Sequence, residues 1–168
     1  LVKLANAEAK KHGVAERASF QVMDVFKADL SRATVVTLYL LPGMMLNLRT
    51  KIFDELRPGT RVVSNSFTME DWEADQTETI SGECTSWCTA LLWIVPAKVE
   101  GTWTTPQGDL KITQNYQKIT GTLGAAKIEG KLNGDEITFT SGKTTYTGKV
   151  NGTTIQGTAP GAWTATKR

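Results

Sequence analysis

Two short apolar segments constrain the fold of this chain more than any other feature. The first is Gln21–Phe26, which carries an acid, Asp24, near its end. The second is Thr34–Leu41, which runs into a turn at Pro42 and then into a stretch with apolar residues at helical spacing. Strand, acid, strand, proline turn and helix are typical of a doubly wound α/β sheet. Sheets of that class bind ligands beyond the carboxyl ends of their strands.

The rest of the first half continues this alternation. We predict helices over Val2–His12, closed by Gly13, and over Met44–Leu56, where Met45, Leu48, Ile52 and Leu56 share one face. We predict strands over Ala18–Met23, Thr34–Leu41, Thr60–Phe67 and Trp87–Val95, with a partner for the last around Thr77–Gly82. Strands that alternate with helices favour a mostly parallel sheet, here over residues 1–97.

From about Lys98 the pattern changes, because the helical period disappears. Short alternating runs rich in Thr and Lys are separated by glycines, and Asn133-Gly134 and Asn151-Gly152 are strong hairpin signals. An apolar residue followed two positions later by glycine recurs, ending at Gly121, Gly130, Gly148 and Gly157, and we assign these glycines to hairpin positions. Residues 98–168 therefore predict an antiparallel meander of roughly six to eight strands, as a curled sheet or small open barrel.

Composition excludes several classes of function. The net charge of +2 gives no general attraction to nucleic acid. The longest apolar run, Ala90–Ala97, is too short to span a bilayer, which needs about 20 residues. No signal peptide is visible, and we expect a cytoplasmic protein without membrane or nucleic-acid partners.

The cysteines and the histidine offer little for catalysis or metal binding. Three residues separate Cys84 from Cys88, and the only histidine, His12, is distant. We interpret the cysteines as two reduced thiols in or beside a strand, with a zinc site or a redox pair as alternatives. We predict no metal site, and a serine–histidine–acid set is not supported.

A family resemblance emerges between Thr34 and Ser64. Thr34–Pro42, Asn47-Leu48-Arg49 and Glu55–Ser64 resemble bacterial class I S-adenosylmethionine-dependent methyltransferases. Within that class, the resemblance is to a branch related to Rossmann-like protein-lysine methyltransferases. Leu92–Ala97 and Gly101-Thr102-Trp103 are similar to the same branch, in which a β-rich extension follows the catalytic fold. The resemblance implies an α/β plus all-β protein, with a partial methyltransferase domain at 1–97 and an extension at 98–168.

The resemblance also implies a site and a cofactor, S-adenosylmethionine. Asp24 and the backbone amide of Val25 match the family positions that face the adenine, where a carboxylate accepts from the amine and an N–H donates to a ring nitrogen. Tyr39 and Leu40, followed by Pro42, match the turn against the methylsulfonium and the incoming nucleophile. Methyl transfer needs alignment and desolvation more than acid–base chemistry. A lysine or another nitrogen nucleophile is the acceptor that the resemblance favours.

Two features depart from the family pattern. Relatives carry His-Asp before the phenylalanine at the end of the fifth strand, whereas this chain has Asn65-Ser66 before Phe67. We assign Asn65 a place beside the reacting groups, with a purely structural hydrogen bonder as the alternative. The first strand and its glycine-rich loop are also missing, so we interpret the chain as the truncated, C-terminal part of such an enzyme. The rival hypothesis is a non-catalytic ligand- or protein-binding module with a relic methyltransferase fold.

Three further expectations follow. Without a first strand, the apolar edge at Val35–Leu41 should pair with a second copy or with a separate N-terminal fragment.

The acids Glu70, Asp71 and Asp75 surround Trp72, in either a solvated loop anchored by that aromatic or a substrate lid. The tryptophans in strand-like runs should pack in the core or seal the interface of the two halves: Trp87, Trp93, Trp103 and Trp163.

Overall fold

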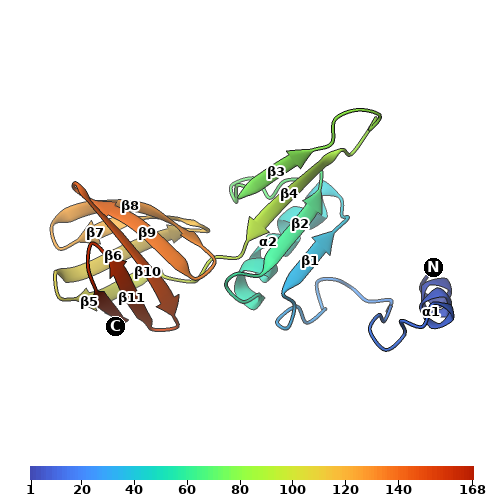
Figure 1. The fold of residues 1–168 in the computed structure, drawn as a ribbon, viewed down its shortest axis with the longest axis horizontal. Helices are drawn as coiled ribbons and strands as arrows, with labels where there is room; N and C mark the ends of the chain where they lie inside the picture. Colours follow the sequence, from blue (N-terminus) through green and yellow to red (C-terminus); the bar gives the residue numbers. More distant parts are fainter.

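The protein is elongated, with a lone helix at one end, a small sheet in the middle and a barrel at the other end (Figure 1). The computed structural model describes all residues from 1 to 168. Neither of the two helices is long and apolar enough to cross a membrane. The fold is mostly β, and its apolar side chains form one cluster beneath the sheet and a second inside the barrel.

The N-terminal helix confirms the sequence prediction within one residue. Helix α1 spans Val2–Lys11, with Lys10 and Lys11 in its last turn, and Gly13 follows at a φ of +66°. That backbone conformation is the one that favours glycine after a helix. Ala9 is the only buried residue of α1, so this helix contributes little to either core.

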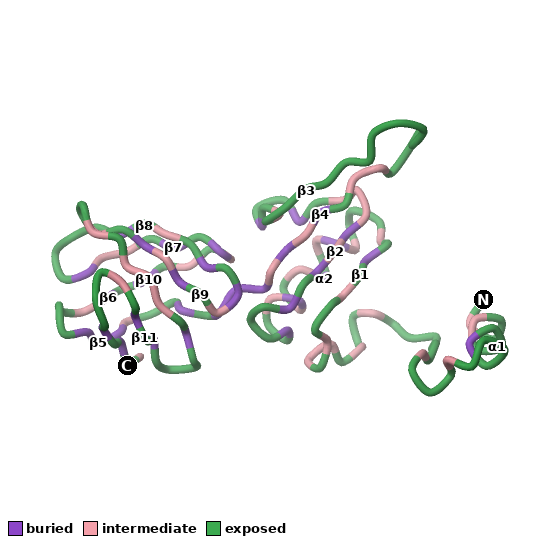
Figure 2. The backbone as a smooth tube through the Cα atoms, in the orientation of Figure 1, coloured by how far each residue is buried: buried purple, intermediate pink, exposed green.

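The predicted strand at Ala18–Met23 is wrong. This segment is extended but joins no sheet, and it is mostly exposed (Figure 2). The backbone of Phe20 is instead hydrogen-bonded to the side chain of Asn6. Asn6 Nδ2 donates to the Phe20 carbonyl at 3.0 Å, and Asn6 Oδ1 accepts from the Phe20 N–H at 3.2 Å. A strand needs a neighbouring backbone for its hydrogen bonds, and no other strand of the chain lies beside this segment.

The small sheet holds four strands in the order β1-β2-β4-β3. Their bounds are Val35–Leu38 for β1, Arg61–Asn65 for β2, Gln76–Thr79 for β3 and Thr89–Ile94 for β4. All four predicted strands of this region exist, but the expectation of a mostly parallel sheet is wrong. Only β1 and β2 are parallel. β3 and β4 are joined by a hairpin, and a hairpin connection requires antiparallel neighbours. β1 is an edge strand that pairs on one side only.

Helix α2, Pro42–Glu55, covers one face of this sheet and leaves the other face open. It begins two residues before the predicted start because proline is well suited to the first turn of a helix. The predicted apolar face is confirmed, since Met45, Leu48 and Ile52 are fully buried. They pack with the inward-facing side chains of the strands, including Val62 and Trp93.

The C-terminal half forms a closed barrel of eight antiparallel strands. The prediction of a curled sheet or small open barrel is therefore wrong. Strands follow one another around the barrel, and β12 closes it by pairing with β5 through Thr166 and Thr104. The bounds are Gly101–Thr105 (β5), Gly108–Asn115 (β6), Lys118–Leu123 (β7), Ala126–Asn133 (β8), Glu136–Ser141 (β9), Thr144–Asn151 (β10), Thr154–Ala159 (β11) and Trp163–Lys167 (β12). Both predicted Asn-Gly hairpins are confirmed, with Gly134 at φ +60° and Gly152 at φ +57°.

The recurring glycines lie inside barrel strands, so their assignment to hairpins is wrong. A Cβ on Gly130 of β8 would collide with the carbonyl oxygen of Thr138, and one on Gly157 of β11 would collide with the Trp163 ring. Glycine in a strand often marks such a close approach. The barrel interior is filled by large side chains, among them Trp103, Phe139 and Trp163.

The junction between sheet and barrel is built around two stacked aromatic rings. Tyr116, between β6 and β7, lies parallel to Trp72 with ring centroids 4.7 Å apart, and its edge meets Phe53 at 5.4 Å. Burial raises the pKa of the Tyr116 hydroxyl. Glu73 adds two polar contacts to the barrel, because its carbonyl accepts from Gln117 and its carboxylate pairs with Lys118 at 2.7 Å.

Trp72 is completely buried, which agrees with the interpretation of residues 68–76 as a loop anchored by that aromatic. Asp71 in this loop pairs with Arg49 of α2. Of the four tryptophans expected in the core or at the interface, Trp93, Trp103 and Trp163 are buried. The expectation is wrong for Trp87, whose side chain is 58% exposed.

Candidate functional site

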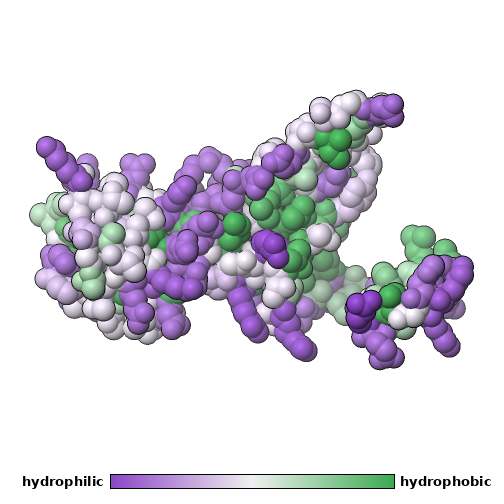
Figure 3. Space-filling view, viewed as in Figure 1, coloured by the Kyte–Doolittle hydropathy of each residue, from purple (hydrophilic) through white to green (hydrophobic).

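A small pocket lies where β1 and β2 end. Because these strands are parallel, their carboxyl ends meet at the same edge of the sheet. Tyr39, Leu40 and Leu41 directly follow β1, and Asn65 ends β2. They line a pocket of about 90 Å³ together with Phe67 and Trp87. Figure 3 shows apolar surface over these strands.

The turn after β2 has an unusual backbone that presents Asn65 at the pocket. Ser66 has a φ of +65°, and its N–H donates to the Thr89 carbonyl at 2.8 Å. Ser64 points toward Met45 of α2. Its hydroxyl donates to the Phe67 carbonyl at 2.9 Å. None of the pocket-lining residues is a carboxylate, an imidazole or an amine, so the pocket has no conventional general base.

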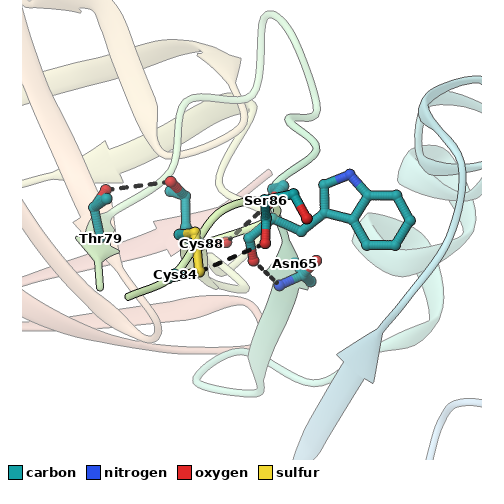
Figure 4. The surroundings of a disulfide bond; sticks show 8 residues. Asn65, Thr79, Cys84, Ser86 and Cys88 are labelled. Carbon is teal, nitrogen blue, oxygen red and sulfur yellow. Dashed lines mark hydrogen bonds between the residues drawn. A yellow bond between two sulfur atoms is a disulfide. The ribbon is translucent and has the colours of Figure 1, made fainter. Parts of the chain in front are cut away.

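The cysteines form a disulfide in the loop between β3 and β4, which corrects the expectation of two reduced thiols. The loop crosses above the carboxyl end of β2, and the Asn65 amide reaches it beside the disulfide (Figure 4). Asn65 Nδ2 donates to the Trp87 carbonyl at 2.9 Å. Trp87 itself has a φ of +57° and lies between the two cysteines. Its ring meets Tyr39 edge to face, with centroids 5.6 Å apart.

A second, larger hollow lies on the sheet face that α2 leaves open. Its volume is about 340 Å³, and Thr37, Val63 and Ala90 line it. Tyr39 and Asn65 line this hollow as well as the small pocket. The two depressions therefore share a wall at the carboxyl ends of β1 and β2.

Neither Asp24 nor Val25 lines the small pocket. The exposed Asp24 carboxylate accepts only the Phe26 N–H, at 3.0 Å. Val25 packs against the core beneath the sheet, and its own N–H has no hydrogen-bond acceptor in the structure. Nearby Asp29 accepts from Ser31, and this hydrogen bonding lowers the pKa of the Asp29 carboxyl.

The structure thus brings together Tyr39, Leu40 and Asn65 among the predicted residues, and Pro42 begins the adjoining helix. Sequence reasoning missed Trp87 as a site residue. The signal that could have found it is its place between two cysteines in a loop between paired strands. Such a loop is polar and exposed as a rule, so an aromatic there is more informative than one in a strand.

Comparisons with known proteins all find methyltransferases. Residues 1–76 match a family model described as the ANTKMT methyltransferase domain. A protein-lysine N-methyltransferase of Saccharolobus islandicus (strain REY15A) is 44% identical over 71 residues, which cover 42% of this chain and 44% of that protein. A human lysine N-methyltransferase named for a component of ATP synthase is 32% identical over 83 residues, covering 49% of this chain and 34% of that protein.

A solved structure is similar as well. The RNA methyltransferase from Salinibacter ruber, in complex with S-adenosyl-L-homocysteine, is 44% identical with a TM-score of 0.54, and the match covers 59% of this chain and 61% of that one. This chain spans less than half the length of the curated relatives that it matches. Residues 1–76 of this chain are thus similar to a methyltransferase family model, and the relatives and the solved structure are methyltransferases as well.

Proposed function

We propose that this protein takes part in the transfer of a methyl group from S-adenosylmethionine to a lysine amine. The observation that carries the proposal is the pocket between Tyr39 and Asn65, two residues that lie inside the segment matched by the methyltransferase family model. Its walls are mostly apolar and carry no charge. Such a pocket suits the desolvation and alignment that methyl transfer requires.

We further propose two domains, a partial Rossmann-like methyltransferase domain at residues 1–97 and a β-barrel extension at 98–168. Two separate hydrophobic clusters support this division, one with members from Leu38 to Val95 and the other from Ala97 to Ala165. The parallel pair β1–β2, which α2 connects, supports the Rossmann-like part, because a parallel pair needs a crossover that is usually a helix.

Asp24 and Val25 are the residues that would hold the adenine. The free Val25 N–H is a donor without a partner, and the Asp24 carboxylate has accepting capacity beyond its one bond to Phe26. These are the donor and acceptor that the edge of an adenine ring requires. Tyr39 and Leu40 would border the sulfonium end, and the bound cofactor would supply an electrophilic methyl group.

Tyr39, Pro42 and Asn65 act in this proposal by shape and not by proton transfer. Pro42 fixes the direction of the turn into α2, and Asn65 ties the end of β2 to the loop above the pocket. The carbonyl oxygens of Tyr39 and Leu40 accept no hydrogen bond in the structure. They are available to orient an incoming amine, whose proton leaves to solvent.

Calorimetric titration with S-adenosylmethionine and S-adenosylhomocysteine tests cofactor binding. Asp24→Ala should weaken binding by about 10- to 100-fold, which corresponds to the loss of about 1.5–3 kcal/mol for a hydrogen bond to a charged group. Asp29→Ala is the matched control, since it removes an exposed acid of the same loop and should leave binding unchanged.

A labelled-methyl assay on protein and RNA fractions then tests the acceptor. Label in lysine residues would support the proposal, and label in RNA alone would overturn the lysine acceptor. If the chain, and any longer product of the same gene, bound neither cofactor form, the proposal would fail in favour of a non-catalytic binding module.

A further inference from the structure

Two aromatic rings from distant parts of the chain face the same small pocket. Tyr39 follows β1 and is 70% exposed, whereas Trp87 belongs to the β3–β4 loop and is 58% exposed. Their ring centroids are 5.6 Å apart at an interplanar angle of 72°. Large aromatics usually bury most of their surface, so two rings that meet while both remain accessible form a candidate binding surface.

Trp87 is held in this position by several independent restraints. The disulfide between Cys84 and Cys88 closes a short ring of backbone around it. Asn65 donates to its carbonyl at 2.9 Å, and the Ile80 N–H donates to the Cys88 carbonyl at 2.9 Å where the loop rejoins the strands. The loop is therefore built to present the indole ring, and the ring does not depend on burial to hold its place.

The pocket selects by size. Its volume of about 90 Å³ is well below the about 300–1,000 Å³ of pockets that hold complete small-molecule ligands. Only the end of a slender group fits here, as the terminal carbon and substituted nitrogen of an alkylamine would.

The pocket also selects by charge. Its lining is aromatic and aliphatic apart from Asn65, and it holds no acid or base. The faces of aromatic rings attract cations, and quaternary ammonium groups are recognised by clusters of such rings. A hydrated primary ammonium loses more water on entering than a methylated one, so the lining favours the methylated forms.

We propose that Tyr39 and Trp87 form an aromatic cleft that binds the alkylammonium end of the acceptor lysine and prefers its methylated states. This inference rests on the proposed function and adds to it a specificity residue, Trp87. Trp87 lies in the β3–β4 loop, beyond the residues that the methyltransferase family model matches.

The test is a titration of the full 168-residue chain followed by the NMR signals of the tryptophan indole N–H groups. The probe is Nα-acetyl-trimethyllysine amide, and its neutral comparison replaces the ammonium nitrogen with carbon. Trp87→Phe assigns the Trp87 signal. We expect that signal to shift on saturation with the trimethyllysine probe, and the neutral analogue to bind at least about fivefold more weakly.

Two variants separate the cleft from the fold of the hairpin. Trp87→Ala should weaken binding of the trimethyllysine probe at least about tenfold. Ile80→Ala, which removes another exposed apolar side chain of the same hairpin, should bind as the unaltered chain does. Ile80→Ala should also leave the affinity for S-adenosylhomocysteine unchanged, because Ile80 lines neither this pocket nor the proposed adenine site.

The outcomes distinguish this inference from the proposed function. Equal affinity for the charged and neutral probes, or a Trp87 signal that does not shift, would overturn the aromatic cleft even if S-adenosylhomocysteine binds. A Trp87 response to the charged probe in a chain that binds no S-adenosylhomocysteine would support the cleft and count against the methyltransferase proposal.

Discussion

Replacement of Tyr116 by alanine should destabilise the sheet without destabilising the barrel. Tyr116 comes from the barrel but makes its contacts with the other half of the molecule. It stacks on Trp72 at 4.7 Å, meets Phe53 at 5.4 Å and lies 5.6 Å below the Arg49 guanidinium. Alanine at this position removes all three contacts while keeping the same backbone.

The magnitude follows from these contacts. Each aromatic pair contributes about 0.5–1.5 kcal/mol beyond its buried area. A cation over an aromatic face at a partly exposed site contributes about 0.5–1 kcal/mol. We therefore expect the sheet to lose about 1.5–4 kcal/mol, which is about a ten- to thousandfold change in its opening equilibrium.

Hydrogen exchange read by mass spectrometry measures the two halves separately. In Tyr116→Ala, peptides from residues 42–95 should exchange faster by that factor, and peptides from 101–167 should be unchanged. Tyr146→Ala is the matched control, because Tyr146 stacks on Phe139 within the barrel at 5.0 Å. It should accelerate exchange in the barrel and leave the sheet protected. Equal acceleration of both halves in Tyr116→Ala, or none in the sheet, would refute the reasoning.

Four further changes test other parts of the structure. The free edge of β1 should pair with that of a second copy. Analytical ultracentrifugation should therefore show a dimer for the unaltered chain and a monomer for Val35→Lys. An unaltered chain that is monomeric, with no second polypeptide present, would contradict this expectation. Burial raises the pKa of the Asp75 carboxyl above its ordinary value of 3.8. The unaltered chain should therefore gain stability as the pH falls from 7 through the raised pKa toward 3.8. Asp75→Asn should have a higher melting temperature at pH 7 and should lack this dependence on pH. Gly130→Ala should cost the barrel about 3 kcal/mol in urea unfolding, because its Cβ would meet the neighbouring strand. Replacement of both Cys84 and Cys88 by serine should speed exchange in residues 80–88 and leave the barrel unchanged; equal protection would show that the disulfide does not hold the loop.

The sequence predicted most elements of secondary structure because their signals are local. Apolar spacing located α2, and glycine-punctuated alternation located most barrel strands. The failure at Ala18–Met23 has a different cause, since a strand also needs a partner and no pattern within a segment supplies one. Closure of the barrel depends on β12 meeting β5, and the same alternating runs are compatible with an open sheet. The strand glycines failed as hairpin signals because the sequence does not reveal how closely neighbouring strands approach.

The site was predictable where the family resemblance covers it and not where it depends on tertiary packing. The resemblance assigned Tyr39 and Asn65 to the site, and the structure brings them together because β1 and β2 are parallel. The position of Trp87 depends on how the β3–β4 loop folds back over β2 and on the bond between Cys84 and Cys88. Spacing alone leaves a disulfide, a metal site and free thiols as alternatives. Disulfides persist mainly in oxidising environments, and the cytoplasmic location stays a prediction.

The pocket joins two parts of the chain that are distant in sequence. Tyr39 and Asn65 lie within residues 1–76, which the family model matches, whereas Trp87 lies beyond that range. The groups that would align a methyl transfer and the wall that would choose an acceptor thus come from separate segments. A change in the β3–β4 loop could alter the acceptor without touching Asp24, Val25 or the turn after β1. For this reason the substrates of similar proteins do not by themselves fix the acceptor of this one, and the titration of the cleft with charged and neutral probes tests the acceptor more directly.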